Sequence, residues 1–267
     1  MKYKIYLFIS LFLLISCNNN SNGIPSHIYP DLNNKIQYQV DWQKKFYDKR
    51  ITEFKASPIG YNQIVLLGNS ITEDAKGWND SIGITNITNR GISGDITDGI
   101  LVRLDEIIYF KPLAIFLLVG INDIYAMNLP EGKQTEKHII NNIIKILEKI
   151  RKKSPQTKLY LQTILPTHRE DIKNQIKRIN SEIINIVQPE VTVIDLYSIF
   201  ANENDLMTNE YTTDGVHLNG YGYDIWINNI RNHINKYSIK KEIVIDPDSI
   251  GLDPDTTDII PDSTNSF

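Results

Sequence analysis

The sequence contains a single cysteine, Cys17, and has no excess of basic residues. One cysteine excludes a disulfide within the chain and any zinc site that needs two thiolates. Lysine and arginine number 28 against 32 aspartates and glutamates, so the net charge of −4 argues against a nucleic-acid-binding protein. Hydrophobic residues make up 41% of the 267 residues, which excludes disorder as the dominant state and allows one or two domains.

A long apolar run occurs at the N-terminus, where two lysines precede the stretch 5–15, interrupted only by Ser10. This run is too short to span a bilayer as a mature helix and is typical of a signal peptide. The small residue before Cys17 resembles a bacterial lipobox, in which cleavage leaves a lipid-modified cysteine. We therefore expect a lipoprotein signal peptide over 1–17, lipidation at Cys17, and an exported protein anchored to a membrane in the periplasm or at the cell surface. A plain secretory signal with an incidental cysteine is the alternative.

The two ends of the remaining chain differ in composition from its middle. Residues 18–35 are rich in Asn, Ser and Gly without periodicity, which predicts a flexible tether. Residues 239–267 are rich in Asp and Pro and lack the spacing of a calcium loop, so we expect an acidic, disordered tail. A single α/β domain is predicted over 36–238.

Short apolar runs and helical periodicities alternate along this domain. Strands are predicted at 64–67, 84–89, 113–119, 158–165 and 191–196, and helices at 37–55, 97–109, 135–153, 171–187 and 220–237. Fully apolar strands separated by helices indicate a parallel sheet that is covered on both faces.

Ligands bind beside the carboxyl ends of the strands in such sheets, and those loops contain the polar residues of interest. Ser70 follows the first strand, and a serine nucleophile needs a base within hydrogen-bond reach. His217 lies in a fitting loop with Asp214 three residues before it, so the pattern predicts a Ser-His-Asp triad. The alternatives are a helix N-cap at Ser70 and an Asx turn over 214–217.

A serine hydrolase also needs hydrogen-bond donors for the oxyanion of its tetrahedral intermediate. We expect these donors to be the backbone N–H groups of Ser70 and Gly91 and the side-chain amide of Asn122. Each of these residues follows a different predicted strand. For Asn122, the alternative is an ordinary turn over 120–123.

Taken together, these residues resemble the four blocks of the SGNH hydrolases, also called the GDSL esterase/lipase family: Ser70, Gly91, Asn122 and His217, with Asp214 as the triad acid. The resemblance runs from about 63 to 234 and includes the companion motifs 90–95 and 195–197. It implies a three-layer α/β/α sandwich with a five-stranded parallel sheet of flavodoxin-like type. The first block departs from the family pattern, because Asn69 stands where the family usually has Asp.

Supporting or packing roles are expected for several further residues. Asn69 and Asp123 are expected to support the site, and Arg90 and Asp95 to brace their loop through an ion pair. Trp78 is predicted to wall the cleft or to pack in the core. Packing or surface roles are expected for the remaining candidates, which are Trp226, His138, His168 and His233.

The resemblance implies a serine esterase that needs no metal and no organic cofactor. The sequence shows no apolar helix or long apolar loop suited to a lid over long acyl chains. The motifs at 68–72 and 90–95 resemble those of compact family members that are short-chain acetylesterases, which implies acetyl esters as substrates. An exported lipoprotein suggests O-deacetylation of a glycan, such as a sialic acid or a plant cell-wall sugar. The alternatives are a lysophospholipase or thioesterase with the same triad and a non-catalytic glycan-binding lipoprotein. The oligomeric state is not predicted.

Overall fold

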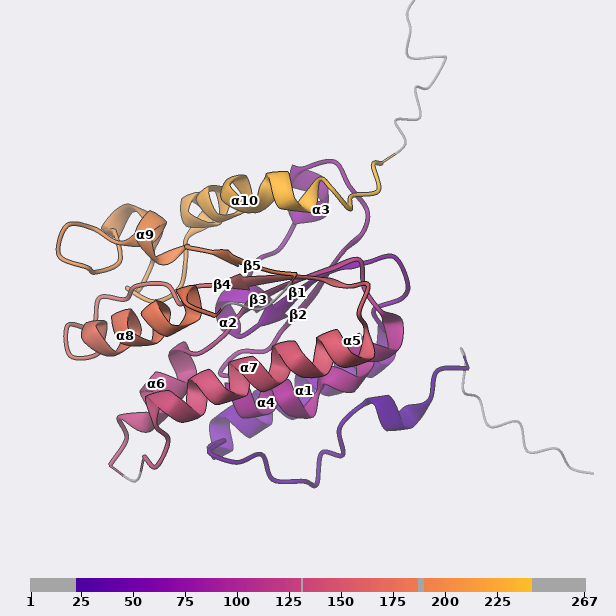
Figure 1. Cartoon of the computed structure of the whole chain (residues 1–267), viewed down its shortest axis with the longest axis horizontal. Helices are drawn as coiled ribbons and strands as arrows, with labels where there is room; N and C mark the ends of the chain where they lie inside the picture. Colours follow the sequence, from indigo (N-terminus) through magenta and orange to yellow (C-terminus); the bar gives the residue numbers. More distant parts are fainter. Residues whose placement is uncertain (1–22, 131, 187–189, 242–267) are drawn as a thin grey trace, which may run out of the picture.

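Five short parallel strands form the centre of the protein in the computed structural model, which describes residues 23–130, 132–186 and 190–241 (Figure 1). They are β1 (Ile64–Gly68), β2 (Ile87–Gly91), β3 (Ala114–Leu118), β4 (Lys158–Gln162) and β5 (Val191–Ile194). Their order in the sheet is β2-β1-β3-β4-β5, and every neighbouring pair is parallel. Helices cover both faces, so the predicted three-layer α/β/α fold is confirmed.

The apolar strands β1 and β3 are buried along their whole length. Successive side chains of a strand point to opposite faces, so each strand contributes to two separate cores. Val65 and Leu67 pack in one core, whereas Ile64 and Leu66 pack in the other. A strand with no polar side needs helices on both faces, which is why the chain alternates between the two kinds of element.

The helices divide between the two faces of the sheet, as Figure 1 shows. The core that contains Val65 is covered by α4 (Thr97–Val102), α5 (Leu104–Phe110), α6 (Ile121–Met127), α7 (Glu136–Lys153) and α8 (Lys173–Ile184). The core that contains Ile64 is covered by α2 (Ser70–Glu73), α3 (Trp78–Ser81), α9 (Tyr197–Phe200) and α10 (Gly220–Ile234). The N-terminal helix α1 (Asp41–Ala56) forms a third cluster with Ile92, just beyond β2. Two short 3-10 helices complete the described elements, η1 (Ser26–Ile28) and η2 (Asn209–Tyr211).

Several predicted elements differ from the observed ones at their ends; β4, for example, ends at Gln162 and α1 starts at Asp41. The second strand starts three residues later than expected, and Ile84 instead forms an isolated antiparallel bridge with Lys240. The single helix predicted at 97–109 is two helices that break at Arg103. Arg103 is buried and donates hydrogen bonds to Asp95 and to the carbonyl of Gly68, contacts that helical periodicity alone does not reveal.

The described part of the predicted tether lies against the domain. Ile28, the last residue of η1, is buried in the core. The Tyr29 hydroxyl lies 3.3 Å from the Glu106 carboxylate. The expectation of a flexible tether is therefore wrong for these residues, because apolar side chains within the polar stretch pack on α5. At the other end, the backbone of Ile239 and Lys241 bonds to residues 83–86, so the domain extends to 241.

Cys17, the predicted signal peptide, and residues 242–267 of the predicted tail lie outside the described residues. Within the described part of the chain, no helix has the length and apolar character needed to cross a membrane.

Candidate active site

The ends of β1, β2 and β3 lie level at one edge of the sheet. Gly68 at the end of β1 is in register with Gly91 of β2 and with Leu118 of β3. The chain leaves β1 between its two neighbours, so the three following loops converge there, as is usual for ligand sites in open α/β sheets. Ser70 and Asn122 lie in the first turns of α2 and α6, the helices that follow β1 and β3.

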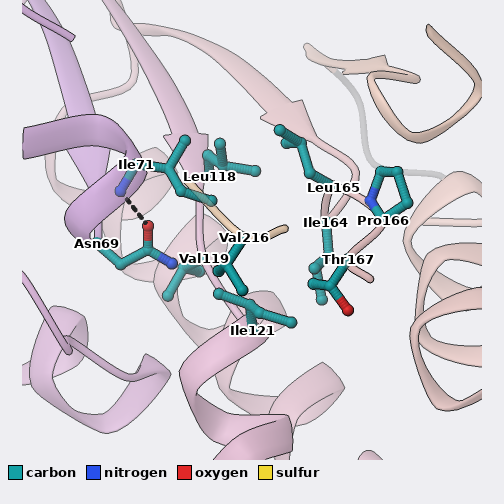
Figure 2. A pocket seen from close by; sticks show the side chains of 10 residues that line it. All are labelled: Asn69, Ile71, Leu118, Val119, Ile121, Ile164, Leu165, Pro166, Thr167 and Val216. Atoms are coloured by element: carbon teal, nitrogen blue, oxygen red, sulfur yellow. Dashed lines mark hydrogen bonds between the residues drawn. The ribbon is translucent and has the colours of Figure 1, made fainter. Parts of the chain in front are cut away.

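A tight turn presents Ser70 as the first residue of α2. Gly68 starts the turn, and a Cβ on it would lie 2.3 Å from the carbonyl oxygen of Leu118. Asn69 is the N-cap of α2, and its Oδ1 accepts a hydrogen bond from the Ile71 N–H at 3.1 Å, a contact drawn in Figure 2. An aspartate would accept the same bond, so Asn69 preserves the turn with one negative charge fewer beside Ser70.

His217 connects Ser70 and Asp214 in one chain of hydrogen-bonding groups. Its Nε2 lies 3.0 Å from Ser70 Oγ, and its Nδ1 lies 2.7 Å from Asp214 Oδ2. The other Asp214 oxygen accepts the backbone N–H groups of Val216 and His217. Although partial burial by itself raises the pKa of Asp214, the hydrogen bonds from His217 and Val216 prevail and lower that pKa to about 2. Asp214 is therefore ionised at neutral pH and orients the imidazole.

The loop that carries Asp214 is braced from behind by His168. The His168 N–H donates to the Gly215 carbonyl at 2.8 Å, and its ring contacts the Met207 carbonyl at 3.0 Å. Gly215 has a φ of +83°, and a Cβ there would lie 2.6 Å from the His168 ring. His168 thus has the packing role expected from the sequence.

The structure contradicts the expected role of Gly91 as an oxyanion donor. Its N–H donates to Asn89 Oδ1 at 2.8 Å, and a Cβ on it would lie 2.1 Å from the backbone nitrogen of Glu73. Gly91 therefore packs under α2. Gly94 lies in the same motif. Together with Ser70 it lines an open cleft, which is described below. Within the described residues, the N–H groups of Ser70 and Gly94 donate no hydrogen bond, so both are available to a ligand.

Asn122 also lines this cleft, as predicted, and its side-chain amide donates to the Asp95 carbonyl at 3.0 Å. That bond uses one of its two N–H groups and fixes the direction of the amide. Asp123 points the other way and accepts hydrogen bonds from the N–H and hydroxyl of Thr97. Complete burial raises the pKa of Asp123 to about 7, even though the bonds from Thr97 oppose the shift.

The predicted ion pair between Arg90 and Asp95 is wrong, because each residue has another partner. Arg90 donates two hydrogen bonds to Glu106, at 2.9 and 3.1 Å, and Asp95 is paired with Arg103 at 2.8 Å. Burial raises the pKa of Asp95 to about 6, against the lowering effect of Arg103. The choice of partners depends on α4 and α5, which approach the loop only in the folded chain.

The loop that contains Gly94 is held by a clamp that the sequence analysis missed. Glu73 of α2 accepts hydrogen bonds from the N–H and the hydroxyl of Ser93, and it pairs with Arg50 of α1 at 3.2 Å. Arg50 also donates to the carbonyl of Gly91 at 3.2 Å. We call Arg50, Glu73 and Ser93 the loop clamp. It ties both ends of the loop to two helices.

The remaining candidates from the sequence do not line the cleft and make packing or hydrogen-bond contacts elsewhere. Trp78 packs edge-on against Trp226 with ring centroids 4.9 Å apart, so it is a core residue and does not wall the cleft. His138 contacts Asp98 at 2.9 Å, and the His233 ring packs on Tyr160. No group of three or more His, Cys, Asp or Glu side chains in the described part of the chain is arranged to hold a metal ion.

An open cleft of about 560 Å³ leads to Ser70, Asn122 and His217. One wall comes from α1 and the residue before it, and another from α6 and the residues after it; their apolar members are Val40, Trp42, Phe46, Ile121, Tyr125, Ala126 and Leu129. The helix predicted at 37–55 was not expected to contribute to the site. Its buried residues Tyr47, Ile51 and Phe54 follow helical spacing, and this leaves Trp42 and Phe46 exposed beside them.

A second, much smaller cavity of about 10 Å³ lies next to the cleft and shares Ile121 and Val216 with it (Figure 2). Its volume is close to the minimum that holds one water molecule. Apolar side chains fill the space around it, including Ile71, Leu118 and Ile164. The region behind Asn69 therefore has no room for a long chain.

Several solved structures are similar to this chain in fold. A GDSL-like lipase from Bacteroides thetaiotaomicron is 26% identical, with a TM-score of 0.62, over 71% of this chain and 97% of that chain. A Streptococcus pneumonia protein proposed to be a platelet activating factor is 26% identical, with a TM-score of 0.63, over 72% and 94%. An acetylxylan esterase from Geobacillus stearothermophilus is 15% identical, with a TM-score of 0.54, over 69% and 99%, and shows the shared fold.

No curated protein matches the chain. The sequence model of the GDSL-like lipase/acylhydrolase family matches residues 66–225, more than half of the chain, and this range includes Ser70, Asn122 and His217. The match confirms the resemblance to SGNH hydrolases. The chain belongs to the GDSL-like lipase/acylhydrolase family and is a carboxylic ester hydrolase.

Proposed function

We propose that this protein hydrolyses short-chain acyl esters, in particular the O-acetyl groups of a carbohydrate, through a Ser70-His217-Asp214 triad. The observation that carries the proposal is the position of His217, 3.0 Å from Ser70 Oγ and 2.7 Å from Asp214 Oδ2. A nucleophile, a base and an orienting carboxylate at these distances are the arrangement that acyl transfer requires.

In the first half of the reaction, His217 Nε2 takes the proton of Ser70 Oγ as this oxygen bonds to the ester carbonyl carbon. Asp214 holds the imidazole in the required tautomer and stabilises its cationic form. His217 then gives the proton to the leaving alcohol oxygen, and the bond between that oxygen and the acyl carbon breaks. Water attacks the acyl-enzyme in the same way, which releases the acid and returns the proton to Ser70.

The oxyanion of each tetrahedral intermediate needs donors that point into the cleft. We assign this role to the N–H groups of Ser70 and Gly94 and to the second N–H of the Asn122 amide. Gly94 replaces Gly91 in this set because the Gly91 N–H is already bonded to Asn89. The loop clamp and the bond from Asn122 to the Asp95 carbonyl hold two of the donors in place before a substrate arrives.

The preference for a short acyl group is supported by the apolar packing beside Ser70. The cavity behind Asn69 holds no more than about one water molecule, so a long acyl chain cannot enter there. The carbohydrate is supported by the acetylxylan esterase that shares the fold. The exposed apolar side chains of the cleft favour a second candidate, a lysophospholipase or thioesterase that uses the same triad.

We also propose that the protein is an exported bacterial lipoprotein, anchored to a membrane through a lipid on Cys17. The proposal is supported by the apolar run at 5–15 and by the polar residues after Cys17. Mass spectrometry of the N-terminal peptide from the native membrane fraction tests it. A peptide that starts at an acylated Cys17 is expected, and an unmodified cysteine would overturn the proposal.

The first experiment measures hydrolysis of p-nitrophenyl acetate and p-nitrophenyl decanoate by the purified protein and by the Ser70→Ala variant. We expect turnover of the acetate by the parent, slower turnover of the decanoate, and loss of both in the variant. Faster turnover of the decanoate would favour a lysophospholipase or thioesterase. A folded parent with no more activity than Ser70→Ala would contradict the triad mechanism and favour a non-catalytic glycan-binding protein.

A further inference from the structure

Large apolar side chains are exposed on α1 and after α6, beside the catalytic cleft. Trp42 is 54% exposed, Phe46 45% and Leu129 43%, and all three line the cleft that contains Ser70. Contiguous exposed apolar side chains on a soluble domain commonly mark a binding surface. Trp42, Phe46 and Leu129 are called the apolar wall below.

Trp42 lines the cleft and also contacts the loop that carries Gly94, a proposed oxyanion donor. A Cβ on Gly94 would lie 2.6 Å from Cζ3 of the Trp42 ring, so the ring edge rests on the Gly94 backbone. The Phe46 ring packs edge-on against Trp42, with centroids 6.3 Å apart, and supports it from the next turn of α1. A group that stacks on Trp42 therefore lies next to the position of the ester carbonyl.

The wall is suited to the alcohol part of the ester. The cavity behind Asn69 holds no more than about one water molecule, whereas the wall borders an open cleft of about 560 Å³. An ester bound with its short acyl group inward extends its alcohol part toward this cleft.

Polar groups beside the wall distinguish a sugar ring from an alkyl chain. Asp74, Gln43 and Ser93 line the same cleft. An alkyl chain would shield the Asp74 carboxylate from water without offering it a hydrogen bond, which is costly. A sugar instead presents hydroxyl groups to the carboxylate and the C–H groups of one ring face to the indole.

The charge of the cleft distinguishes neutral from anionic sugars. Among its lining residues in the described part of the chain, none is a lysine or an arginine. Asp74 is paired with the exposed Lys76 at 3.4 Å, a residue that does not line the cleft. A sugar carboxylate in the cleft would thus approach Asp74 without a lining cation to balance it.

We propose that the apolar wall and Asp74 form a binding site for the alcohol part of the ester, and that this part is a neutral pyranose ring stacked on Trp42. The inference rests on the proposed esterase function and narrows its substrate to acetylated neutral glycans, in place of sialic acids and other anionic sugars. It also assigns α1, which lies outside the family match at 66–225, to substrate recognition.

The test compares methyl mono-O-acetyl-xylopyranoside with ethyl acetate, whose alcohol part has no ring to stack on Trp42, and with octyl acetate and O-acetylated sialic acid. For Trp42→Ala we expect the KM for the xyloside to rise about tenfold, and kcat/KM to fall several times more for the xyloside than for ethyl acetate. Trp42→Phe, which keeps a ring, and Phe46→Ala, which removes the support, should have smaller effects of the same kind. Tyr221→Ala removes an aromatic side chain that is also 54% exposed but lies outside the cleft, and should change nothing.

The parent should turn over the xyloside with a higher kcat/KM than the sialic acid ester, and Asp74→Asn should narrow that difference. If kcat/KM of Trp42→Ala fell by the same factor for the xyloside and for ethyl acetate, Trp42 would only support the Gly94 loop, and the proposal would be overturned. A loss confined to octyl acetate would identify an alkyl chain as the occupant, and preference for the sialic acid ester would exclude a neutral sugar. If the parent hydrolyses none of these esters, the esterase proposal itself fails, which is a distinct result.

Discussion

Glu73 Oε2 accepts two hydrogen bonds from one residue, Ser93: the backbone N–H at 2.6 Å and the hydroxyl at 2.7 Å. Glu73 lies three residues after the proposed nucleophile, and Ser93 lies one residue before the proposed oxyanion donor Gly94. A single carboxylate thus fixes the distance between α2, which carries Ser70, and the loop that carries Gly94. Arg50 of α1 pairs with the same carboxylate and completes the clamp.

We expect Glu73→Ala to lower kcat for p-nitrophenyl acetate about tenfold or more with little change in KM, because the Gly94 N–H is then no longer held for the transition state. Glu73→Gln keeps an acceptor and should recover part of the loss. Glu53→Gln is the matched control, since Glu53 also binds Arg50 but does not touch Ser93. A rise in KM with unchanged kcat would contradict the positioning role.

We expect Gly94→Ala to lower kcat about a hundredfold. The φ of +79° at Gly94 disfavours a side chain, and the added Cβ would collide with the Trp42 ring and displace the N–H. Gly60→Ala is the control for strain alone, because Gly60 has a φ of +77° with nothing within 4 Å of an added Cβ. Equal activity of Gly94→Ala and the parent would remove Gly94 from the oxyanion site.

Replacing Asn122 separates its chemical role from its packing role. We expect Asn122→Ala to lower kcat by about 10²–10³, the usual effect of removing one oxyanion donor. Asn122→Asp has nearly the same shape but loses the donor and adds a negative charge, so it should be at least as impaired. Steady-state kinetics and thermal unfolding of both variants check this, and near-normal kcat in Asn122→Asp would indicate a packing role only.

Asp123 predicts a pH dependence of stability. Burial raises its pKa to about 7, whereas its pKa in the unfolded chain is close to 3.8. Between these values the folded state holds a proton that the unfolded state has released, so stability from this group is present below about pH 4 and is lost as the pH rises through 7. We expect the free energy of unfolding of the parent to fall by about 3 kcal/mol between pH 5 and pH 8 on account of this group.

Urea unfolding of the parent and of Asp123→Asn at both pH values tests the prediction. The asparagine keeps an acceptor for Thr97 and cannot ionise, so its free energy of unfolding should change less over this range. The same pH dependence in both proteins would show that Asp123 does not titrate there.

The sequence by itself determined the layers of the fold and most of the site. Contiguous apolar runs such as 64–67 and 113–119 fit only strands buried on both faces, and this is a local property of the chain. Ser70, Asn122 and His217 line the cleft. His217 lies in the loop before α10, whereas Ser70 and Asn122 closely follow the ends of β1 and β3. In a parallel sheet all such ends lie at one edge.

Only the tertiary structure decided which groups meet across long distances in the sequence. Gly91 and Gly94 lie in one motif. Gly91 is not the oxyanion donor because its N–H is bonded to Asn89 and its Cα packs against α2. The partners of Arg90 and Asp95 come from α5 and from the break after α4. The role of α1 as a cleft wall depends on its docking beside Ile92, because helical periodicity shows which side chains are buried but not which surface lies next to the exposed ones.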